Sequence, residues 1–382
     1  MATLKRSPAL CFAEPFRLFF PLGLLLGGIG VSLWPLFVWR VIEFYPATPH
    51  MRLMIEGMMG SFVIGFLGTA GPRLLDAEPL HTWEGGGLLF LQISSAALHL
   101  AQRSFGGDVF FLALLLFFLA TLLRRAGART DLPPPSFVLV IFGFANAIGG
   151  LLLILFSSSS RFWHQTGTLM LNEGFIALPI LGVGAFFFPK LLGSGGTPEP
   201  ADLQIGAALG GLCGLVFSSS FPLEAGGWTR SAALLRGLTS LWYFLAQGRL
   251  LDRATERPFL ARCFQLGALL LVAGFFLAAI FPGYRLANLH VVFIGGFSVI
   301  LFTVSTRVVL GHSGHADLFQ RRLPFLVGAL GLLVLAMLTR GSAEIFLAGR
   351  NRHLVYAALV WLIAAGLWTW SLGPKLFLRE EE

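Results

Sequence analysis

Three histidines and two glutamates of this sequence are candidate metal ligands. His50, His164 and His290 stand at or near the starts of apolar stretches, and Glu56 and Glu173 lie inside two of those stretches. Histidine is the commonest metal ligand in proteins and the usual axial ligand of non-covalently bound haem. His50 and His290 lie on different expected helices and could bind one iron between them. We therefore predict these two as haem ligands, and His164, Glu56 and Glu173 as further metal candidates.

The same kinds of residue also have a purely structural interpretation. An ionisable side chain within a membrane span costs about 2.5–3.5 kcal/mol on insertion scales, so it usually faces a bundle interior and has a partner. Glu56, Glu173, His290, His99 and Arg236 fall within expected spans and could simply form hydrogen bonds between helices. We favour a ligand role for His290, because we expect it in a buried position.

Other histidines are more consistent with solvated positions. His164 follows Trp163 in an expected loop, and His312 and His315 belong to the sequence GHSGH that follows an apolar stretch. The 22 residues from His290 to His312 (312 − 290) would span roughly 33 Å in a helix. His312 therefore cannot share a site with His290, and we expect it in a solvated loop.

Three methionines share one face of an expected helix. Met51, Met54 and Met58 follow the spacing i, i+3 and i+7, which brings side chains together on a helix. A thioether suits Cu(I) or an axial position on haem iron. Core packing explains such a stripe more often than a metal does, because methionine fills irregular gaps. Both interpretations stay open.

A pair of ionisable residues recurs in three apolar stretches. A residue near the start of each stretch is followed 17 residues later by a basic one, as in Glu56 and Arg73, Glu173 and Lys190, and His290 and Arg307. A helix of that length spans about 25 Å, close to the thickness of a bilayer's hydrocarbon core. The starts are 117 residues apart in both steps (173 − 56 and 290 − 173). Equal offsets predict a unit that occurs three times.

Twelve membrane-spanning helices are expected to position these residues. Runs of about twenty apolar residues are long enough to cross a bilayer. They fall at about 16–39, 53–71, 85–101, 106–123, 136–156, 167–188, 203–222, 230–247, 259–281, 287–310, 324–339 and 354–371. The predicted fold is therefore an all-α membrane protein, with four helices in each of three repeats. The repeats are predicted at about 14–126, 134–248 and 257–372, within a single polytopic domain of residues 1–382.

The composition also predicts a polytopic membrane protein. Of the 382 residues, 56% are hydrophobic and only 12% are charged, and the mean hydropathy is +0.79. The net charge of +8 is better explained by loop cations at a membrane surface than by a nucleic-acid interface, because no dense cluster of Lys, Arg and aromatic residues occurs. The cysteines form no CxxC or CxxCH pattern, so neither a disulfide framework nor covalently attached haem is indicated.

Loop cations predict the orientation in the membrane. With the N-terminus inside, 17 Lys and Arg residues fall at the inner ends of the expected spans and 9 at the outer ends. Cytoplasmic loops carry an excess of Lys and Arg. Both termini are therefore expected in the cytoplasm. The second, sixth and tenth spans then run from outside to inside.

Several motifs resemble those of the NnrS family of bacterial membrane proteins. They are PFRLFF at 15–20, HMRLM at 50–54, GFLGTA at 65–70, and the stretch from His290 to TRVVLGHSG at 306–314. The resemblance implies a twelve-span protein of the bacterial inner membrane that binds haem b, with copper as a further candidate. It also implies a role in defence against nitric oxide. The positions carried over are His50, Met54, His290, Arg307 and His312.

The chain departs from the family's usual His-x-His-Glu-Met at two positions. Arg52 stands in place of the second histidine and Leu53 in place of the glutamate, so any ligand role of those two positions is lost. Arg52 could instead pair with a haem propionate. The layout of three four-helix repeats is similar to that of the haem-copper oxidase catalytic subunit, in which the second, sixth and tenth helices carry ligands. That similarity says little about chemistry.

Two other functions are compatible with the sequence. A twelve-span secondary transporter or exporter could use the buried carboxylates of Glu56 and Glu173, although a repeat of three by four differs from the inverted halves common in transporters. A structural or sensory membrane subunit would use the bundle only as a scaffold. The sequence does not decide between binding and catalysis, and it gives no oligomeric state.

Overall fold

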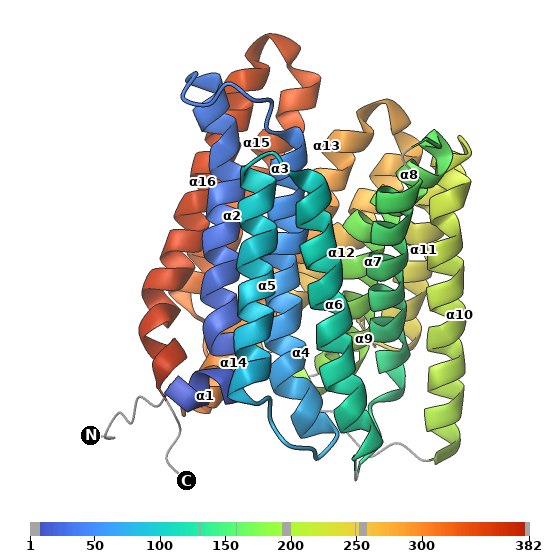
Figure 1. The fold of residues 1–382 in the computed structure, drawn as a ribbon, viewed down its shortest axis with the longest axis vertical. Coiled ribbons are helices and arrows are strands. Elements are labelled where there is room, and N and C mark those ends of the chain that lie inside the picture. Colours follow the sequence, from blue (N-terminus) through green and yellow to red (C-terminus); the bar gives the residue numbers. More distant parts are fainter. Residues whose placement is uncertain are drawn as a thin grey trace. The chain divides into compact units, whose positions relative to one another are not determined.

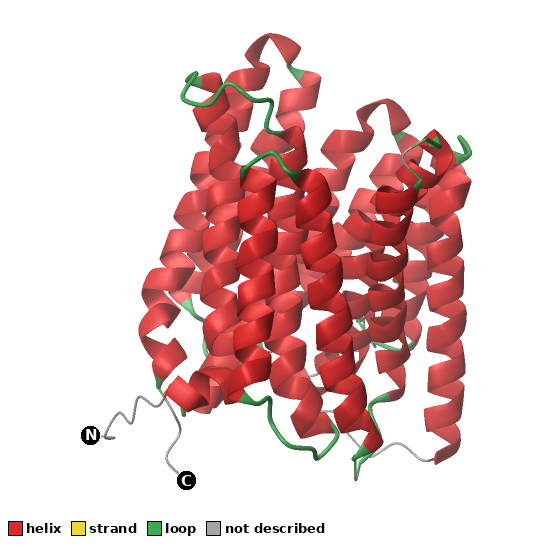
Figure 2. Ribbon diagram, in the orientation of Figure 1, coloured by secondary structure: helices red, strands yellow, loops and turns green. Residues whose placement is uncertain are grey.

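The computed structural model describes residues 8–129, 131–157, 159–192, 200–248, 250–251 and 258–378. Helices make up most of this part of the chain, and within it there is no strand (Figure 2). The prediction of an all-helical protein is confirmed. Ten helical segments of the described residues are long and apolar enough to cross a membrane, so the chain is a multi-pass membrane protein.

A helix occupies each of the twelve ranges expected from the sequence. The α-helices are α1 Pro8–Ala13, α2 Phe16–Val38, α3 Ala47–Arg52, α4 Gly60–Leu74, α5 Thr82–Leu100, α6 Ser104–Gly127, α7 Val138–Phe156, α8 Arg161–Leu169, α9 Phe175–Leu191, α10 Pro200–Ala225, α11 Thr229–Ala246, α12 Phe259–Ile280, α13 Arg285–His290, α14 Val299–His312, α15 Pro324–Ile345 and α16 Arg350–Leu372. Of the long ones, α5 and α11 are not among the ten apolar candidates. Both carry buried ionisable residues, His99 in α5 and Arg236 in α11.

Three of the long helical segments contain a π-helical stretch. These stretches are η1 Leu53–Met59, η3 Met170–Gly174 and η5 Val291–Ser298, and each connects a short α-helix to a longer one. A π-helix is rare, and it is found frequently at functional sites. The wider turn changes the backbone hydrogen bonding, and in η1 the carbonyl of Glu56 accepts a hydrogen bond from Gln92 Nε2 at 3.0 Å.

The chain divides into two compact units. The first consists of residues 1–133, 301–332 and 354–382, and the second of residues 134–300 and 333–353. In the first unit α2 packs on α4 and η1, and α5 packs on α6 (Figure 1). In the second unit α7 packs on α9, and α11 packs on α10 and α12. The single domain, the repeat boundaries and the oxidase-like layout stay predictions.

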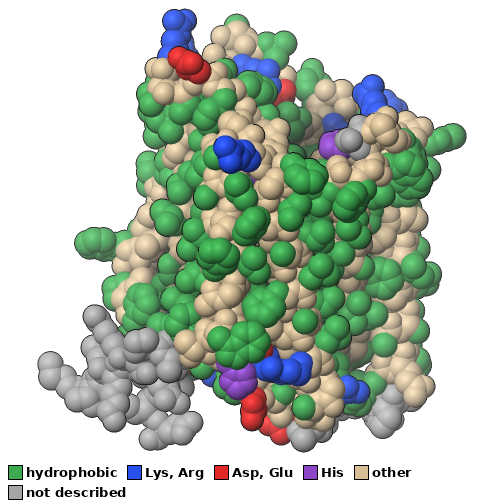
Figure 3. Space-filling view, viewed as in Figure 1, with side chains coloured by type: hydrophobic (Ala, Val, Ile, Leu, Met, Phe, Trp, Pro, Cys, Tyr) green, Lys and Arg blue, Asp and Glu red, His purple; other side chains and the backbone are tan. Residues whose placement is uncertain are grey.

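Hydrophobic side chains cover the middle of the helices on the face shown in Figure 3, and charged and histidine side chains gather near the helix ends. Exposed apolar residues such as Phe90, Ile93 and Leu116 are expected where a helix faces lipid. Aromatic side chains fill the interior of the first unit, where the rings of Phe20 and Phe62 stack with centroids 4.8 Å apart. The polar residues buried among them are the ones that need partners.

Candidate functional site

Four ionisable side chains meet in the interior of the first unit. They are Arg52 at the end of α3, Glu56 in η1, His99 at the end of α5 and Asp108 at the start of α6. All four are buried, with at most 4% of each residue exposed. The three-residue connection between α5 and α6 keeps His99 close to Asp108. The π-helical turn carries Glu56 into the same site.

Arg52 holds the two carboxylates together. Its Nε lies 2.9 Å from Oδ1 of Asp108 and 3.2 Å from Oε1 of Glu56, and its Nη2 donates to Oδ2 of Asp108 at 3.0 Å. His99 completes the group, with Nε2 3.0 Å from Oε2 of Glu56 and 3.8 Å from Oδ1 of Asp108. Buried charges need such partners, because removing a charge from water is costly.

Three of these residues could hold a metal ion. Glu56, His99 and Asp108 each offer one ligand atom, and these atoms lie within 4.8 Å of one another. Carboxylate oxygen and imidazole nitrogen are ligands of Zn²⁺ and related ions. The ring of His99 packs directly on Gly107, where an added Cβ would lie 2.4 Å from its Cε1. A glycine at this position is therefore required for the ring to approach α6.

A second buried group of ionisable residues lies in the second unit. Arg236 Nη1 lies 2.7 Å from Oε2 of Glu173. Arg285, which is half-buried, places Nη2 2.9 Å from the other oxygen of Glu173. Both arginines also pair with Glu224. Two arginines thus face two glutamates, and the charges of this group balance. Glu173, a predicted metal candidate, lies inside this network.

His50 and Met54, two predicted cofactor residues, both contact Gly30 of α2. Nδ1 of His50 lies 2.9 Å from the carbonyl oxygen of Gly30, and an added Cβ on Gly30 would lie 3.2 Å from the sulfur of Met54. Both side chains are half-buried. Arg52 lies between them in the sequence, but its guanidinium turns to Asp108 instead. A pairing of Arg52 with a haem propionate stays a prediction.

The remaining predicted histidines lie in the second unit. His290, expected in a buried position, is half-buried, and its Nδ1 lies 2.7 Å from the carbonyl oxygen of Leu286. His164 is exposed, as its sequence context indicates, but it belongs to α8 and not to a loop. His50 lies in the first unit. A shared iron between His50 and His290, and a common depth for Glu56, Glu173 and His290, therefore stay predictions.

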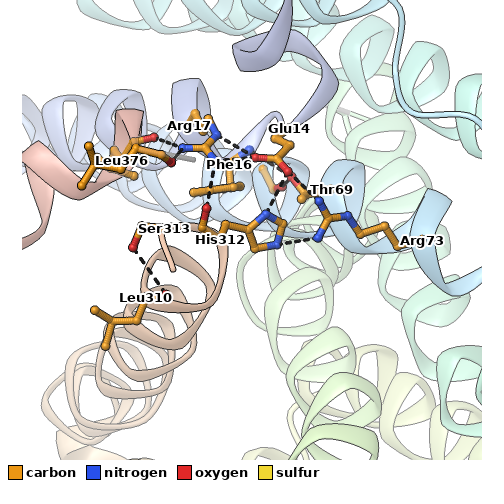
Figure 4. A network of polar contacts seen from close by, with 11 residues as sticks. Glu14, Phe16, Arg17, Thr69, Arg73, Leu310, His312, Ser313 and Leu376 are labelled. Carbon is orange, nitrogen blue, oxygen red and sulfur yellow. Dashed lines mark hydrogen bonds and ion pairs between the residues drawn. The ribbon is translucent and has the colours of Figure 1, made fainter. Parts of the chain in front are cut away.

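His312 is part of a polar network at one end of the first unit (Figure 4). Its Nδ1 lies 3.0 Å from Oε1 of Glu14, and its Nε2 lies 3.1 Å from Nη1 of Arg73. Arg73 also binds Oε1 of Glu14 at 2.5 Å. The expectation of a solvated loop histidine is wrong for His312, because this residue ends α14 and its imidazole packs against the ring of Phe16 with centroids 4.8 Å apart.

Arg17 extends this network to the C-terminal end of the described chain. It binds Glu14 through Nε at 2.7 Å, and its Nη1 donates to the carbonyl oxygens of Leu376 and Leu378. The start of α2 and the end of the chain after α16 therefore meet at the same end of the first unit. Which side of the membrane this end faces stays a prediction.

The charges around Glu14 control its ionisation. Burial raises the pKa of this carboxyl, but the hydrogen bonds and charges of His312 and Arg17 outweigh burial and lower the pKa from 4.5 to about 2. Glu14 is therefore an anion at neutral pH.

Arg307, the other basic residue of the C-terminal motif, lies over the ring of Phe319 at 4.2 Å. The side chain of Lys190 lies outside the described residues.

The sequence analysis did not single out several members of these groups, namely Glu14, Asp108, Glu224 and Arg285. Asp108 and Arg285 each stand in the first turns of an apolar segment, and Glu224 stands in the last turn of one. Each is a charged residue at the edge of an expected span, and this position is the feature of the sequence that could have identified it as a site residue. The same position also suits a solvated residue, so the signal does not identify a partner.

Comparisons with known proteins agree with the motifs in the sequence. The family model described as NnrS protein matches residues 10–379, nearly the whole chain. The matched region contains both buried groups of ionisable residues and the network around His312. No curated protein matches the chain.

Proposed function

Because the chain belongs to the NnrS family, we propose that it is a haem-binding membrane protein of the nitric oxide response. Haem b is the proposed cofactor, copper is a second candidate, and His50 and His290 are the proposed axial ligands. The proposed location is the bacterial inner membrane, with both termini in the cytoplasm. The observation that carries this proposal is the hydrogen bonding of the two imidazoles.

The hydrogen bonds of the two imidazoles support a ligand role for them. Nδ1 of His50 faces the carbonyl oxygen of Gly30 at 2.9 Å, and Nδ1 of His290 faces the carbonyl oxygen of Leu286 at 2.7 Å. A carbonyl oxygen only accepts, so each Nδ1–H donates, and in a neutral imidazole Nε2 is then the nitrogen that carries the lone pair. Metal-binding histidines almost always donate their second ring nitrogen in this way. When bound, haem would supply an iron to which nitric oxide can bind.

Met54 supports copper as the second candidate. Its sulfur and the imidazole of His50 lie against the same glycine of α2. An imidazole together with a thioether is a ligand set that suits copper. The absence of a Cβ on Gly30 leaves room for the sulfur of Met54, which would lie 3.2 Å from such an atom.

The positions of the π-helical segments support a threefold repeat. Their first residues are Leu53, Met170 and Val291, and the intervals of 117 and 121 residues (170 − 53 and 291 − 170) resemble the interval found in the sequence. Each lies in or beside the second, sixth or tenth expected span. We propose three four-helix repeats, with those helices as the ones that carry the cofactor ligands.

The transporter alternative relies on Glu56 and Glu173. Both carboxylates are already paired with buried arginines, Glu56 with Arg52 and Glu173 with Arg236. A carboxylate that binds and releases a substrate cation would have to exchange these partners at a substantial electrostatic cost. We therefore prefer the haem protein.

Absorbance of the purified protein tests the proposal. Protein from haem-replete cells is expected to show a Soret band that shifts when nitric oxide is added. His50→Ala and His290→Ala should each remove or shift this band, because each change removes a proposed ligand. His81→Ala is the matched control, since His81 is exposed and is not a proposed ligand, and it should leave the spectrum unchanged.

Two results would contradict the proposal. One is folded protein from haem-replete cells without a Soret band. The other is a Soret band that survives both ligand substitutions unchanged, which would place any haem elsewhere. Folding of each variant is checked by gel filtration in detergent.

A further inference from the structure

The buried group around Arg52 has the ligand atoms of a metal site and a cation already beside them. Glu56, His99 and Asp108 supply the ligand atoms. The Nε of Arg52 lies 3.2 Å from Oε1 of Glu56 and 2.9 Å from Oδ1 of Asp108. These two oxygens lie on different helical segments, and one guanidinium bridges them. Arg52 is itself 4% exposed, so solvent screens its electrostatic interactions only weakly.

We propose that Arg52 is the built-in cation of this site and that it keeps the triad of Glu56, His99 and Asp108 from binding a divalent metal ion. Arg52 is thus a specificity-determining residue, because it separates a metal-free polar site from a metal site. This inference is independent of haem at His50 and His290. It concerns a different set of ligand atoms.

Counting charges gives the first argument. His99 must be neutral to bind a metal ion, and two carboxylates and one guanidinium then leave one excess negative charge. A divalent ion would change this to one excess positive charge. The buried site would therefore carry an unbalanced charge both with and without the ion. Without Arg52 the carboxylates carry two negative charges, and a divalent ion would neutralise them. A buried site strongly favours the neutral combination, because uncompensated charge in a low dielectric is costly.

Geometry gives the second argument. Zinc binds carboxylate oxygen and imidazole nitrogen at about 2.0–2.2 Å. Nε2 of His99 lies 3.0 Å from Oε2 of Glu56 and 3.8 Å from Oδ1 of Asp108, spacings that three ligands around one small ion can adopt. The ion would bind Oδ1 of Asp108, the oxygen that Arg52 contacts at 2.9 Å. The guanidinium would then lie next to the ion, and the two positive charges would repel each other.

The second unit supports the same role for arginine. There the carboxylates of Glu173 and Glu224 are also held by guanidinium groups, from Arg236 and Arg285. The two carboxylates of the second unit contact two arginines and no histidine, so their negative charges are balanced. In the first unit one arginine and one histidine contact the two carboxylates. When Arg52 is substituted, the first unit is left with two carboxylates and a histidine, which is a set of metal ligands.

Zinc binding by substituted proteins tests the inference. Wild type, Arg52→Lys, Arg52→Gln and Arg52→Met are purified in detergent, incubated with Zn²⁺, passed through a desalting column and analysed for zinc. Each is compared with the same protein carrying His99→Phe, and the difference is the zinc held by the triad. Arg52→Lys is the matched control because it keeps the positive charge.

The expected results are no His99-dependent zinc in wild type and Arg52→Lys, and about one zinc per chain in Arg52→Gln and Arg52→Met. His99-dependent zinc in wild type would overturn the proposal, and so would a folded Arg52→Gln protein that binds none. If the neutral variants are recovered folded only when zinc is present, the proposal is supported. His99-dependent zinc in wild type refutes the proposal even if neither neutral variant is recovered.

Discussion

Nδ1 of His312 lies 3.0 Å from Oε1 of Glu14, although 298 residues separate the two in the sequence. This contact joins the end of α14 to the residues just before α2. His312 belongs to the motif that resembles the NnrS family, and in this chain its side chain is a structural partner of a carboxylate. Arg73 and Arg17 bind the same carboxylate, so Glu14 connects three helices.

The ionisation of Glu14 predicts how stability depends on pH. The folded protein lowers the pKa of this carboxyl from 4.5 to about 2, so the anion is favoured in the folded state. Its contribution is fully present above pH 4.5 and is lost as the pH falls toward 2. Thermal unfolding in detergent should therefore show wild type losing stability in this window.

Glu14→Gln removes that dependence. The variant is expected to be less stable than wild type at pH 7, by about 1–3 kcal/mol for the lost charged hydrogen bonds. The difference should shrink as the pH is lowered from 4.5 to 2. Glu43→Gln is the control, because Glu43 is exposed. An unchanged difference between wild type and Glu14→Gln across this window would contradict the prediction.

Gly107 is predicted to be essential for the position of His99. An alanine Cβ would lie 2.4 Å from Cε1 and 2.5 Å from Nε2 of the His99 ring, so the ring must move away from residue 107. Gly107→Ala should therefore destabilise the protein by about 1–3 kcal/mol, the usual cost of overpacking. Chemical denaturation in detergent measures the change.

Gly86→Ala is the matched control for this substitution. Gly86 lies in α5, and a Cβ there meets nothing within 4 Å. Alanine is favoured over glycine inside a helix by roughly 0.5–1 kcal/mol, so this variant should be as stable as wild type or more so. Equal stabilities of the two variants would mean that the ring of His99 adjusts freely.

The helices could be predicted from the sequence because each long apolar run has one explanation, a span of a bilayer. The buried charges Glu56, Glu173, His99 and Arg236 were also visible, since each interrupts such a run. Their partners were not visible. Asp108 and Glu224 become partners only through the packing of α6 and α10, and a single sequence contains no information on which helices are neighbours.

The π-helical segments show the same limit at the level of the backbone. The residues of η1, η3 and η5 are apolar or small apart from Glu56, Asn172, Glu173 and Ser298, as in an ordinary α-helix. Nothing in their types distinguishes a π-helix, because the wider turn depends on neighbouring helices. His312 was misjudged for a related reason, since its partner Glu14 precedes it by nearly the whole chain.

Two adjacent arginines are predicted to differ in their contribution to stability. Arg125 is 3% exposed, binds Glu84 through Nη2 at 2.6 Å and also donates to the carbonyl oxygens of Glu78 and Pro79. The neighbouring Arg124 binds Glu84 at 2.8 Å with a side chain that is 53% exposed. Arg125→Met should cost about 3–5 kcal/mol, because it leaves a buried carboxylate without its main partner.

Arg124→Met is expected to cost less than about 1 kcal/mol, since an exposed ion pair is screened by water. Both variants lose one positive charge and gain the same side chain. A difference between their denaturation midpoints therefore measures what burial and the additional hydrogen bonds of Arg125 contribute together. Equal midpoints would contradict the prediction.

The balanced charges of the second unit predict a compensating double substitution. Glu173→Gln leaves Arg236 and Arg285 facing only Glu224, so the buried group gains one excess positive charge. That change should destabilise the protein by about 3–5 kcal/mol. Arg285→Gln alone leaves one excess negative charge and should also destabilise it. The double variant retains Glu224 and Arg236, a neutral pair with 3% and 1% of each residue exposed.

The double variant is therefore expected to be more stable than Glu173→Gln alone, despite carrying one more substitution. Denaturation of the four proteins gives the interaction energy between the two positions, which should exceed about 1 kcal/mol for residues in contact. Once Arg285 is replaced, the loss of the Glu173 charge no longer leaves an unpaired arginine. The destabilisation by the double substitution should therefore be smaller than the sum of the two single effects. If they do add, Glu173 and Arg285 contribute independently, and charge balance does not explain why this group can be buried among apolar helices.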